Sequence, residues 1–149
     1  MEQNLREMFQ IMGRRLGLLN KNCCTTGGIE ISIAQSHILY ELDRQHQPSM
    51  QQVADTLGID ITTFSRQIQS LIKQNLVKKT PSSEDGRVYL LSLTPEGKFI
   101  ATTIDQQMNA FFNDVFEKMN AFERDTVIRS ILLLNESMSK SPLCCKPMG

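Results

Sequence analysis

Apolar side chains recur at helical spacing over most of the chain. The first such stretch predicts a helix over residues 4–22, and the run 23–28, rich in threonine and glycine, predicts a loop. Shorter patterns predict helices over 33–45, 50–57 and 61–75. Three helices in quick succession, separated by short polar links, are therefore expected in the middle of the chain.

Capping residues mark the ends of these middle helices. Ser49 and Gln52 have the spacing of a capping box, in which each side chain bonds the backbone N–H of the other residue. Gly58 suits the left-handed position after a helix, and Asp60 is a favoured N-cap for the helix that follows. The connection between these two helices is therefore expected to be a tight turn.

The pattern changes to alternation after this group of helices. Residues 77–80 and 88–93 predict two strands, and the polar stretch 81–86 between them predicts the turn of a hairpin. Thr94 followed by Pro95 is typical of a helix start. The hairpin is therefore expected to lead directly into a helix.

Two long helices are expected at the C-terminal end. The first extends over about six turns, judged by its apolar spacing. The last begins at Asn120, which forms a capping-box pair with Glu123, and ends before Pro142. Together with the first helix, these two carry more apolar surface than a small three-helix core can cover, which predicts a partner chain.

Composition places the chain among ordinary globular proteins. It has 149 residues, of which 40% are apolar and 21% are charged, enough for one domain. No apolar run has the length of a transmembrane helix, and the polar N-terminus lacks the apolar core of a signal peptide. A cytoplasmic location is expected. No ordered set of nucleophile, base and acid stands out, so an enzyme is not expected.

The net charge is zero, but the cations are concentrated in one segment. Residues 61–80 contain Arg66, Lys73, Lys78 and Lys79 and no acid. A neutral protein with one cationic face can bind a polyanion through that face. On charge alone, a solvated cationic helix end is the alternative interpretation.

The order of elements and three short motifs resemble the multiple-antibiotic-resistance regulator (MarR) family of winged-helix repressors. Segment 53–59 is similar to the family's helix before the turn, and segment 62–68 is similar to its recognition helix. Asp85-Gly86-Arg87, followed by Leu93-Thr94 and Gly97, is similar to the family's wing signature. The resemblance covers nearly the whole chain.

This resemblance implies a mainly α fold with a small β-hairpin wing (α+β): a winged helix-turn-helix with long terminal dimerisation helices. Residues 1–32 and 95–149 would form the dimerisation region, and residues 33–94 the DNA-binding region, in one interlocked domain. The resemblance also implies an obligate homodimer that binds a pseudo-palindromic operator in double-stranded DNA and acts as a repressor.

The resemblance and side-chain chemistry together select the expected DNA contacts. Arg66 can pair bidentately with guanine and Gln67 with adenine, whereas Lys73 would bind phosphate without reading sequence. By the resemblance, Arg87 at the wing tip would reach the minor groove, with Asp85 orienting it. The complete expected set is Ser49, Thr62, Thr63, Ser65, Arg66, Gln67, Lys73 and Arg87.

Four cysteines form two adjacent pairs, Cys23-Cys24 and Cys144-Cys145, near opposite ends of the chain. Adjacent cysteines join poorly to each other, structural disulfides are unusual in the cytoplasm, and the Cys-x-x-Cys spacing of zinc sites is absent. Thiolates favour thiophilic ions. Among these ions, trivalent arsenic or antimony binds three thiolates. The four cysteines are therefore candidate ligands for such an inducer.

Three interpretations of the cysteines stay open: binding of a thiophilic ion, oxidation of the thiols, and no function. None of them requires a cofactor. A different inducer, a small lipophilic or phenolic compound, would use an apolar pocket lined by residues such as Leu39, Phe99 or Phe111, between the dimerisation and DNA-binding regions. A thiol protein that stores soft metal and a protein-interaction module are the rivals outside this class.

Overall fold

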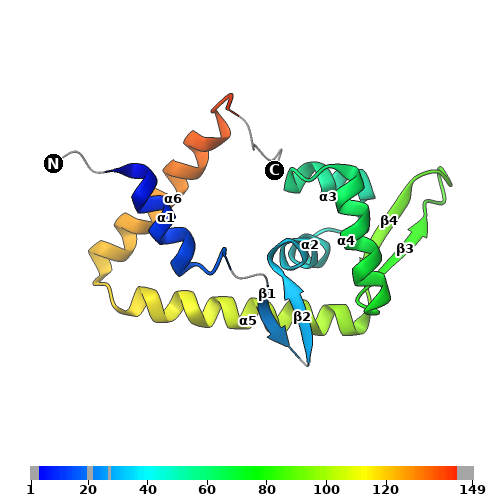
Figure 1. Cartoon of the computed structure of the whole chain (residues 1–149), viewed down its shortest axis with the longest axis horizontal. Helices are drawn as coiled ribbons and strands as arrows, with labels where there is room; N and C mark the ends of the chain where they lie inside the picture. Colours follow the sequence, from blue (N-terminus) through cyan, green and yellow to red (C-terminus); the bar gives the residue numbers. More distant parts are fainter. Residues whose placement is uncertain (1–3, 20–21, 27, 144–149) are drawn as a thin grey trace.

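The computed structural model describes residues 4–19, 22–26 and 28–143, with only the backbone described for 22–26. Six helices and two hairpins make up this part of the chain, which confirms the predicted fold class (Figure 1). In order, the elements are α1 (Leu5–Arg15), β1 (Asn22–Thr26), β2 (Ile29–Ser32), α2 (Ile33–Arg44), α3 (Met50–Leu57), α4 (Ile61–Lys73), β3 (Val77–Pro81), β4 (Tyr89–Leu93), α5 (Pro95–Glu117) and α6 (Ala121–Ser139).

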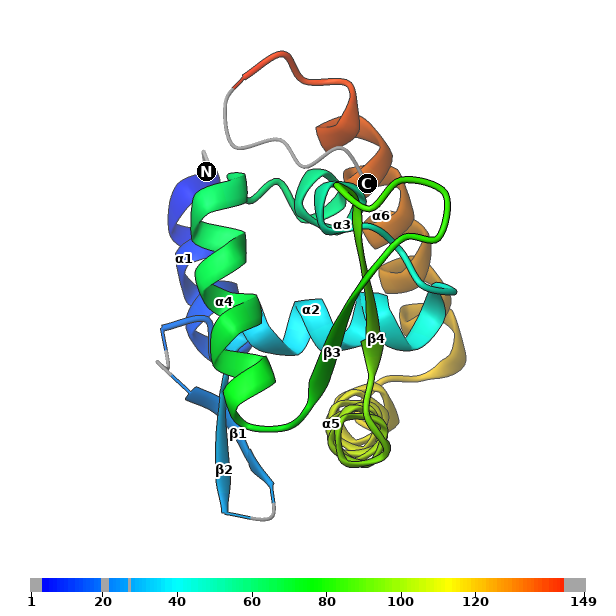
Figure 2. The same ribbon diagram turned by 90° about the vertical axis from the view of Figure 1, so that its right-hand side faces the viewer.

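One hydrophobic core lies in the part of the chain that we call the winged half, residues 29–104. There α2, α3 and α4 pack together with the β3–β4 hairpin and the first turns of α5 (Figure 2). Every buried apolar side chain of the described residues lies between Ile31 and Ile104. Burial of one large apolar side chain contributes about 1.5–3 kcal/mol, so this half is held by its own contacts.

The helices α1 and α6, called the terminal helices below, lie at the end of α5 remote from α4 (Figure 1). The view along α5 in Figure 2 shows them well apart from each other. Neither contains a buried residue, so their apolar side chains are open to solvent or to a partner. None of the described helices has the combination of length and apolarity needed to cross a bilayer.

The N-terminal segment differs from its prediction. Helix α1 ends at Arg15, well before the predicted end, and Gly17 then takes a left-handed conformation (φ 77°) that turns the chain away. Residues 22–26, expected to form a loop, are strand β1, which pairs antiparallel with β2. The β-branched threonines and isoleucines of the two strands favour this pairing, a signal that helical spacing does not reveal.

The predicted caps of the middle helices are confirmed. Ser49 Oγ accepts a hydrogen bond from the N–H of Gln52 (3.1 Å), and Gln52 Oε1 accepts one from the N–H of Ser49 (2.8 Å). Gly58 ends α3 in the left-handed conformation (φ 68°). Asp60 Oδ1 accepts a 3.0 Å hydrogen bond from the N–H of Thr63 and caps α4. These caps fix the turn between α3 and α4.

A compact joint connects the end of α4 to the start of α5. Asn75 has a left-handed conformation (φ 59°), and its carbonyl accepts a 2.7 Å hydrogen bond from the hydroxyl of Thr94. Thr94 Oγ1 also accepts from the N–H of Gly97 (2.9 Å), as predicted for the N-cap of α5. A Cβ at Gly97 would lie 1.9 Å from the carbonyl oxygen of Leu76, so only glycine permits this close approach.

The β3–β4 hairpin stands beside α4 (Figure 2). Its register pairs Val77 with Leu93 at the base and Pro81 with Tyr89 near the tip. The segment before α3 is attached to it, because the N–H of Leu91 donates a 2.9 Å hydrogen bond to the carbonyl of Pro48. The hairpin is thereby anchored at the middle of β4, while its turn extends beyond the last strand pair.

Candidate nucleic-acid interface

Helix α4 has a buried apolar face and an exposed polar face. Phe64, Ile68 and Leu71 point into the core, which leaves the opposite positions of the helix in solvent. Of the residues expected to contact DNA, those exposed on α4 are Thr62, Thr63, Arg66 and Lys73, and those partly buried are Ser65 and Gln67. The six predicted side chains therefore belong to one helix that stands at the surface of the molecule (Figure 2).

The cations of this region keep their charge free for a ligand. In the part of the chain that the structure describes, Arg66, Lys73, Lys78 and Lys79 form no ion pair with a carboxylate. The ammonium of Lys79 lies 4.4 Å from the centroid of the Tyr89 ring, across the β3–β4 hairpin. Among the described residues, no carboxylate therefore pairs with the cations of segment 61–80, which suits the binding of a polyanion.

The wing tip carries an ordered pair, Asp85 and Arg87. Asp85 Oδ1 accepts hydrogen bonds from the backbone N–H of Arg87 (3.0 Å) and from its Nε (3.2 Å). The backbone N–H first, and the side chain second, hold the pKa of the Asp85 carboxyl below its usual range. The Arg87 side chain is 92% exposed, so Asp85 orients a guanidinium that projects into solvent, as expected.

Ser49, one of the residues expected to contact DNA, is the N-cap of α3. Its hydroxyl already accepts from the N–H of Gln52, within the capping box. The N–H groups of Met50 and Gln51 have no intrahelical acceptor, because they belong to the first turn. If α3 contacts a phosphate, these two backbone groups and the helix dipole are what it offers. The role of Ser49 itself stays a prediction.

The cysteine pairs were the predicted inducer site. Cys23 and Cys24 lie on β1, where Cys24 is opposite Ile31 and the pairing is irregular between Asn22 and Cys24. The side chains of this pair, and all of Cys144-Cys145, lie outside the described residues. In the remainder, no group of three His, Cys, Asp or Glu side chains is arranged to hold a metal ion. Binding of an inducer by these four cysteines stays a prediction.

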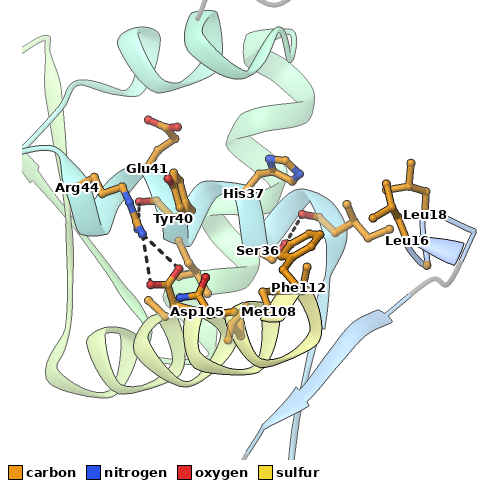
Figure 3. Close-up of a pocket in the computed structure, with 16 residues that line it drawn as sticks. Leu16, Leu18, Ser36, His37, Tyr40, Glu41, Arg44, Asp105, Met108 and Phe112 are labelled. Carbon is orange, nitrogen blue, oxygen red and sulfur yellow. Dashed lines mark hydrogen bonds and ion pairs between the residues drawn. The ribbon is translucent and has the colours of Figure 1, made fainter. Parts of the chain in front are cut away.

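A cavity of about 430 Å³ lies between α2, α5 and the turn after α1 (Figure 3). Its wall is mainly apolar and includes Leu39 and Phe112. On one side the Arg44 guanidinium donates to both carboxylate oxygens of Asp105 (3.2 and 3.3 Å) and lies 3.4 Å from the centroid of the Tyr40 ring. This is a suitable volume for a small molecule with one polar end.

The residues expected at an apolar pocket are only partly correct. Leu39 lines the 430 Å³ cavity, whereas Phe111 lines a separate apolar groove of about 440 Å³ between α1 and α5. Phe99 is 64% exposed and lines neither. The prediction was wrong for Phe99 because it lies off the buried stripe of α5, which Ile100 and Ile104 form.

Sequence reasoning missed the polar side of this cavity. Tyr40 and Arg44 are four residues apart on α2, a spacing that brings side chains together on one helix face and could have indicated their contact. Asp105 is 61 residues from Arg44 in the chain. No local signal connects the two, so this ion pair follows only from the packing of α2 on α5.

Comparison with known proteins agrees with this geometry. Residues 29–88 match the model of the MarR family. The HTH-type transcriptional regulator PapX of Escherichia coli is 26% identical over 96 residues, which cover 64% of this chain and 58% of PapX. The transcriptional regulator AdcR of Streptococcus pyogenes serotype M6 is 27% identical over 114 residues, which cover 74% of this chain and 76% of AdcR.

The fold agrees over a longer span. The crystal structure of Streptococcus pneumoniae FabT in complex with DNA has a TM-score of 0.79 to this chain at 19% identity, and the match covers 89% of this chain and 93% of FabT. The family match spans β2, the three middle helices and the wing tip with Arg87. The family match, the sequence relatives and the shared fold together support a MarR-type winged-helix transcriptional regulator.

Proposed function

We propose that this chain is a homodimeric repressor that binds a pseudo-palindromic operator and is released by a thiol-reactive inducer. The observation that carries the DNA-binding part is the pair of exposed cations on α4, Arg66 and Lys73, which have no carboxylate partner within the described residues, together with the exposed guanidinium of Arg87 on the wing. A helix enters the major groove, and an arginine on a hairpin can follow the adjacent minor groove. FabT, which shares the fold, was crystallised with DNA.

The homodimer part rests on apolar side chains that the protomer leaves open. Helix α6 exposes Ile131, Leu134 and Met138 at helical spacing, and α1 exposes Met8 and Met12. Contiguous apolar patches of this kind mark protein interfaces. Two copies would also supply the two helices that a two-fold symmetric operator requires.

Selection of binding sequences from a random duplex library, followed by titration of variants, tests DNA binding. We expect Arg66→Ala to weaken binding to the selected sequence by about 1–3 kcal/mol, the worth of a bidentate arginine–guanine pair. Arg87→Ala should weaken binding and leave the dimer intact. Lys118→Ala, which removes an exposed cation after α5, is the matched control and should leave the affinity unchanged.

Salt dependence separates phosphate contacts from base contacts. Lys73→Ala should lower the slope of log K against log salt by about one, without changing the selected sequence. A wild-type protein that enriches no sequence would contradict the DNA-binding proposal. Unchanged affinity in both Arg66→Ala and Arg87→Ala would contradict it equally, because the cationic surface would then have no role.

The inducer part rests on four cysteines, Cys23, Cys24, Cys144 and Cys145. Trivalent arsenic or antimony, another thiophilic ion and an oxidant would all act on these thiols. We expect arsenite to release the protein from DNA in the wild type and not in a variant with all four cysteines changed to serine. Release by peroxide alone would favour an oxidant, and release of the serine variant by arsenite would exclude a thiol mechanism.

A second candidate inducer is a small lipophilic or phenolic compound in the 430 Å³ cavity. The observation that favours it is an apolar wall with a polar end formed by Tyr40, Arg44 and Asp105 (Figure 3). A panel of phenols and aromatic acids, added to the DNA complex, tests it. Leu39→Trp should fill the cavity and abolish release by such a compound while leaving release by arsenite unchanged.

A further inference from the structure

The side chain of Gln35 joins the start of α2 to helix α4. Gln35 is 7% exposed, and its Oε1 accepts a 3.1 Å hydrogen bond from the N–H of Ser32. Ser32 Oγ in turn accepts from the N–H of Gln35 (3.1 Å), which completes a capping box. The remaining polar group, Nε2, donates a 3.3 Å hydrogen bond to Oγ of Ser70 on α4. One buried amide thus ties together two helices.

This arrangement exceeds what a helix cap requires. The other two capping boxes of the described residues, Ser49 with Gln52 and Asn120 with Glu123, are exposed, and their hydrogen bonds stay within one helix end. Gln35 and Thr94 are the buried polar side chains of the part described. A buried amide costs free energy unless its groups are bonded, so the bond to α4 satisfies a group that capping leaves open.

The link connects the β1–β2 hairpin to the helix expected to contact DNA. Ser32 is the last residue of β2 and pairs with Asn22 of β1, the neighbour of Cys23. Ser70 lies one turn after Arg66 on α4. A rotation of α4 about its axis moves both side chains together, so the position of Ser70 governs the direction of Arg66.

We propose that Gln35 is a positioning residue for DNA recognition, which fixes the rotation of α4 through Ser70. The inference rests on the proposed DNA-binding function and deepens it. Because the link begins at the end of the β1–β2 hairpin, it also gives a reaction at the cysteines of β1 a path to the DNA-contacting surface. A displacement of Ser32 moves the Gln35 amide, and the amide moves α4.

A double-mutant cycle on operator affinity tests the link, with Gln35→Ala, Ser70→Ala and the combined variant. We expect each single variant to bind about fivefold to tenfold more weakly, and the combined variant to bind no more weakly than Gln35→Ala alone, because both changes remove the same hydrogen bond between Gln35 and Ser70. Glu123→Ala removes the exposed capping acceptor of α6 and is the matched control, with unchanged affinity expected. Chemical denaturation of the same proteins confirms that all are folded at the concentrations used.

Ser32→Ala tests the hairpin end of the link. Its effect on operator affinity should disappear in the Ser70→Ala background, whereas an equal loss in both backgrounds would overturn the path from the hairpin. Additive losses for Gln35→Ala and Ser70→Ala, or unchanged affinity in Ser70→Ala, would overturn the positioning role alone. A wild type that selects no DNA sequence would instead remove the proposed function together with this inference.

Discussion

The winged half and the terminal helices use apolar side chains in opposite ways. In the winged half, the apolar stripes of α2, α3 and α4 meet one another, and Phe64 has no exposed surface. In the terminal helices no residue is buried, and Phe122 is 78% exposed. The same helical periodicity therefore produces a packed core in the winged half and an open apolar surface on the terminal helices, the surface that the proposed dimer would cover.

Charged side chains differ between segment 61–80 and the C-terminal helices. The cations of α4 and of the following strand lack carboxylate partners within the described residues, whereas near the C-terminal end cations pair with acids one turn away, as in Lys118–Asp114, Arg129–Asp125 and Lys140–Glu136. Such exposed pairs stabilise a helix by only about 0.3–0.5 kcal/mol each. In the winged half, Arg44, Arg87 and Lys98 also pair with carboxylates, so the cations without a carboxylate partner that distinguish this half are those of α4 and β3.

The largest difference between the two regions should appear in core truncations. Phe64→Ala removes a fully buried ring and should lower the free energy of unfolding by about 3–5 kcal/mol, because it leaves a cavity among well-packed neighbours. Phe122→Ala removes an exposed ring, and its effect within the protomer should be small. Urea denaturation monitored by circular dichroism measures both.

The dependence of stability on protein concentration distinguishes contacts within one protomer from contacts between two protomers in this experiment. If Phe122 lies in an interface, Phe122→Ala should lower stability more at low concentration than at high concentration, whereas the loss in Phe64→Ala should not depend on concentration in this way. Equal losses for the two variants at every concentration would mean that the two regions do not differ as described.

A charge on the open stripe of α6 should give the next largest effect. Ile131→Glu places a carboxylate among the apolar side chains of α6, and each buried unpaired polar group costs about 1–3 kcal/mol. We expect the variant to sediment as a monomer at concentrations where the wild type is a dimer. Ser137→Glu, an exposed position off the stripe, is the matched control, and a dimeric Ile131→Glu variant would show that this face of α6 is not the interface.

The features that the sequence predicts well are those decided by neighbours in the chain. The capping boxes, the left-handed Gly58 and the orienting contact of Asp85 with Arg87 each depend on residues at most three positions apart. The β1–β2 hairpin was missed because Gly17 shortens the first helix and leaves room for a strand that helical spacing does not indicate. Local patterns therefore predict that a helix or strand exists better than they predict the residues at which it begins and ends.

Contacts between distant segments could not be predicted from the sequence. The ion pair of Arg44 with Asp105 and the hydrogen bond of Gln35 with Ser70 join residues 61 and 35 positions apart. A glutamine three residues after a serine is read as a cap, and nothing in that pattern shows that its amide reaches another helix. Such contacts exist only after α2 packs against α5 and α4.

The smallest expected effect is that of low pH on the wing turn, through protonation of Asp85. The backbone N–H of Arg87 and then its side chain lower the pKa of Asp85 from its ordinary value of 3.8, so the ionised carboxylate stabilises the wing turn. This contribution is complete above pH 3.8 and is lost as the pH falls through the lowered pKa. At neutral pH the turn should therefore be insensitive to small changes of pH, unlike a device based on histidine.

An NMR titration that follows the backbone amide of Arg87 measures the protonation of Asp85. Its inflection should lie below 3.8. Asp85→Asn is the matched control, because an asparagine oxygen can still accept from the N–H of Arg87 but does not titrate, so the step should vanish while the turn persists. An inflection above 3.8 would mean that Arg87 does not hold the carboxylate, and the wing turn would then depend only on its other hydrogen bonds, such as that from the N–H of Ser82 to the carbonyl of Val88.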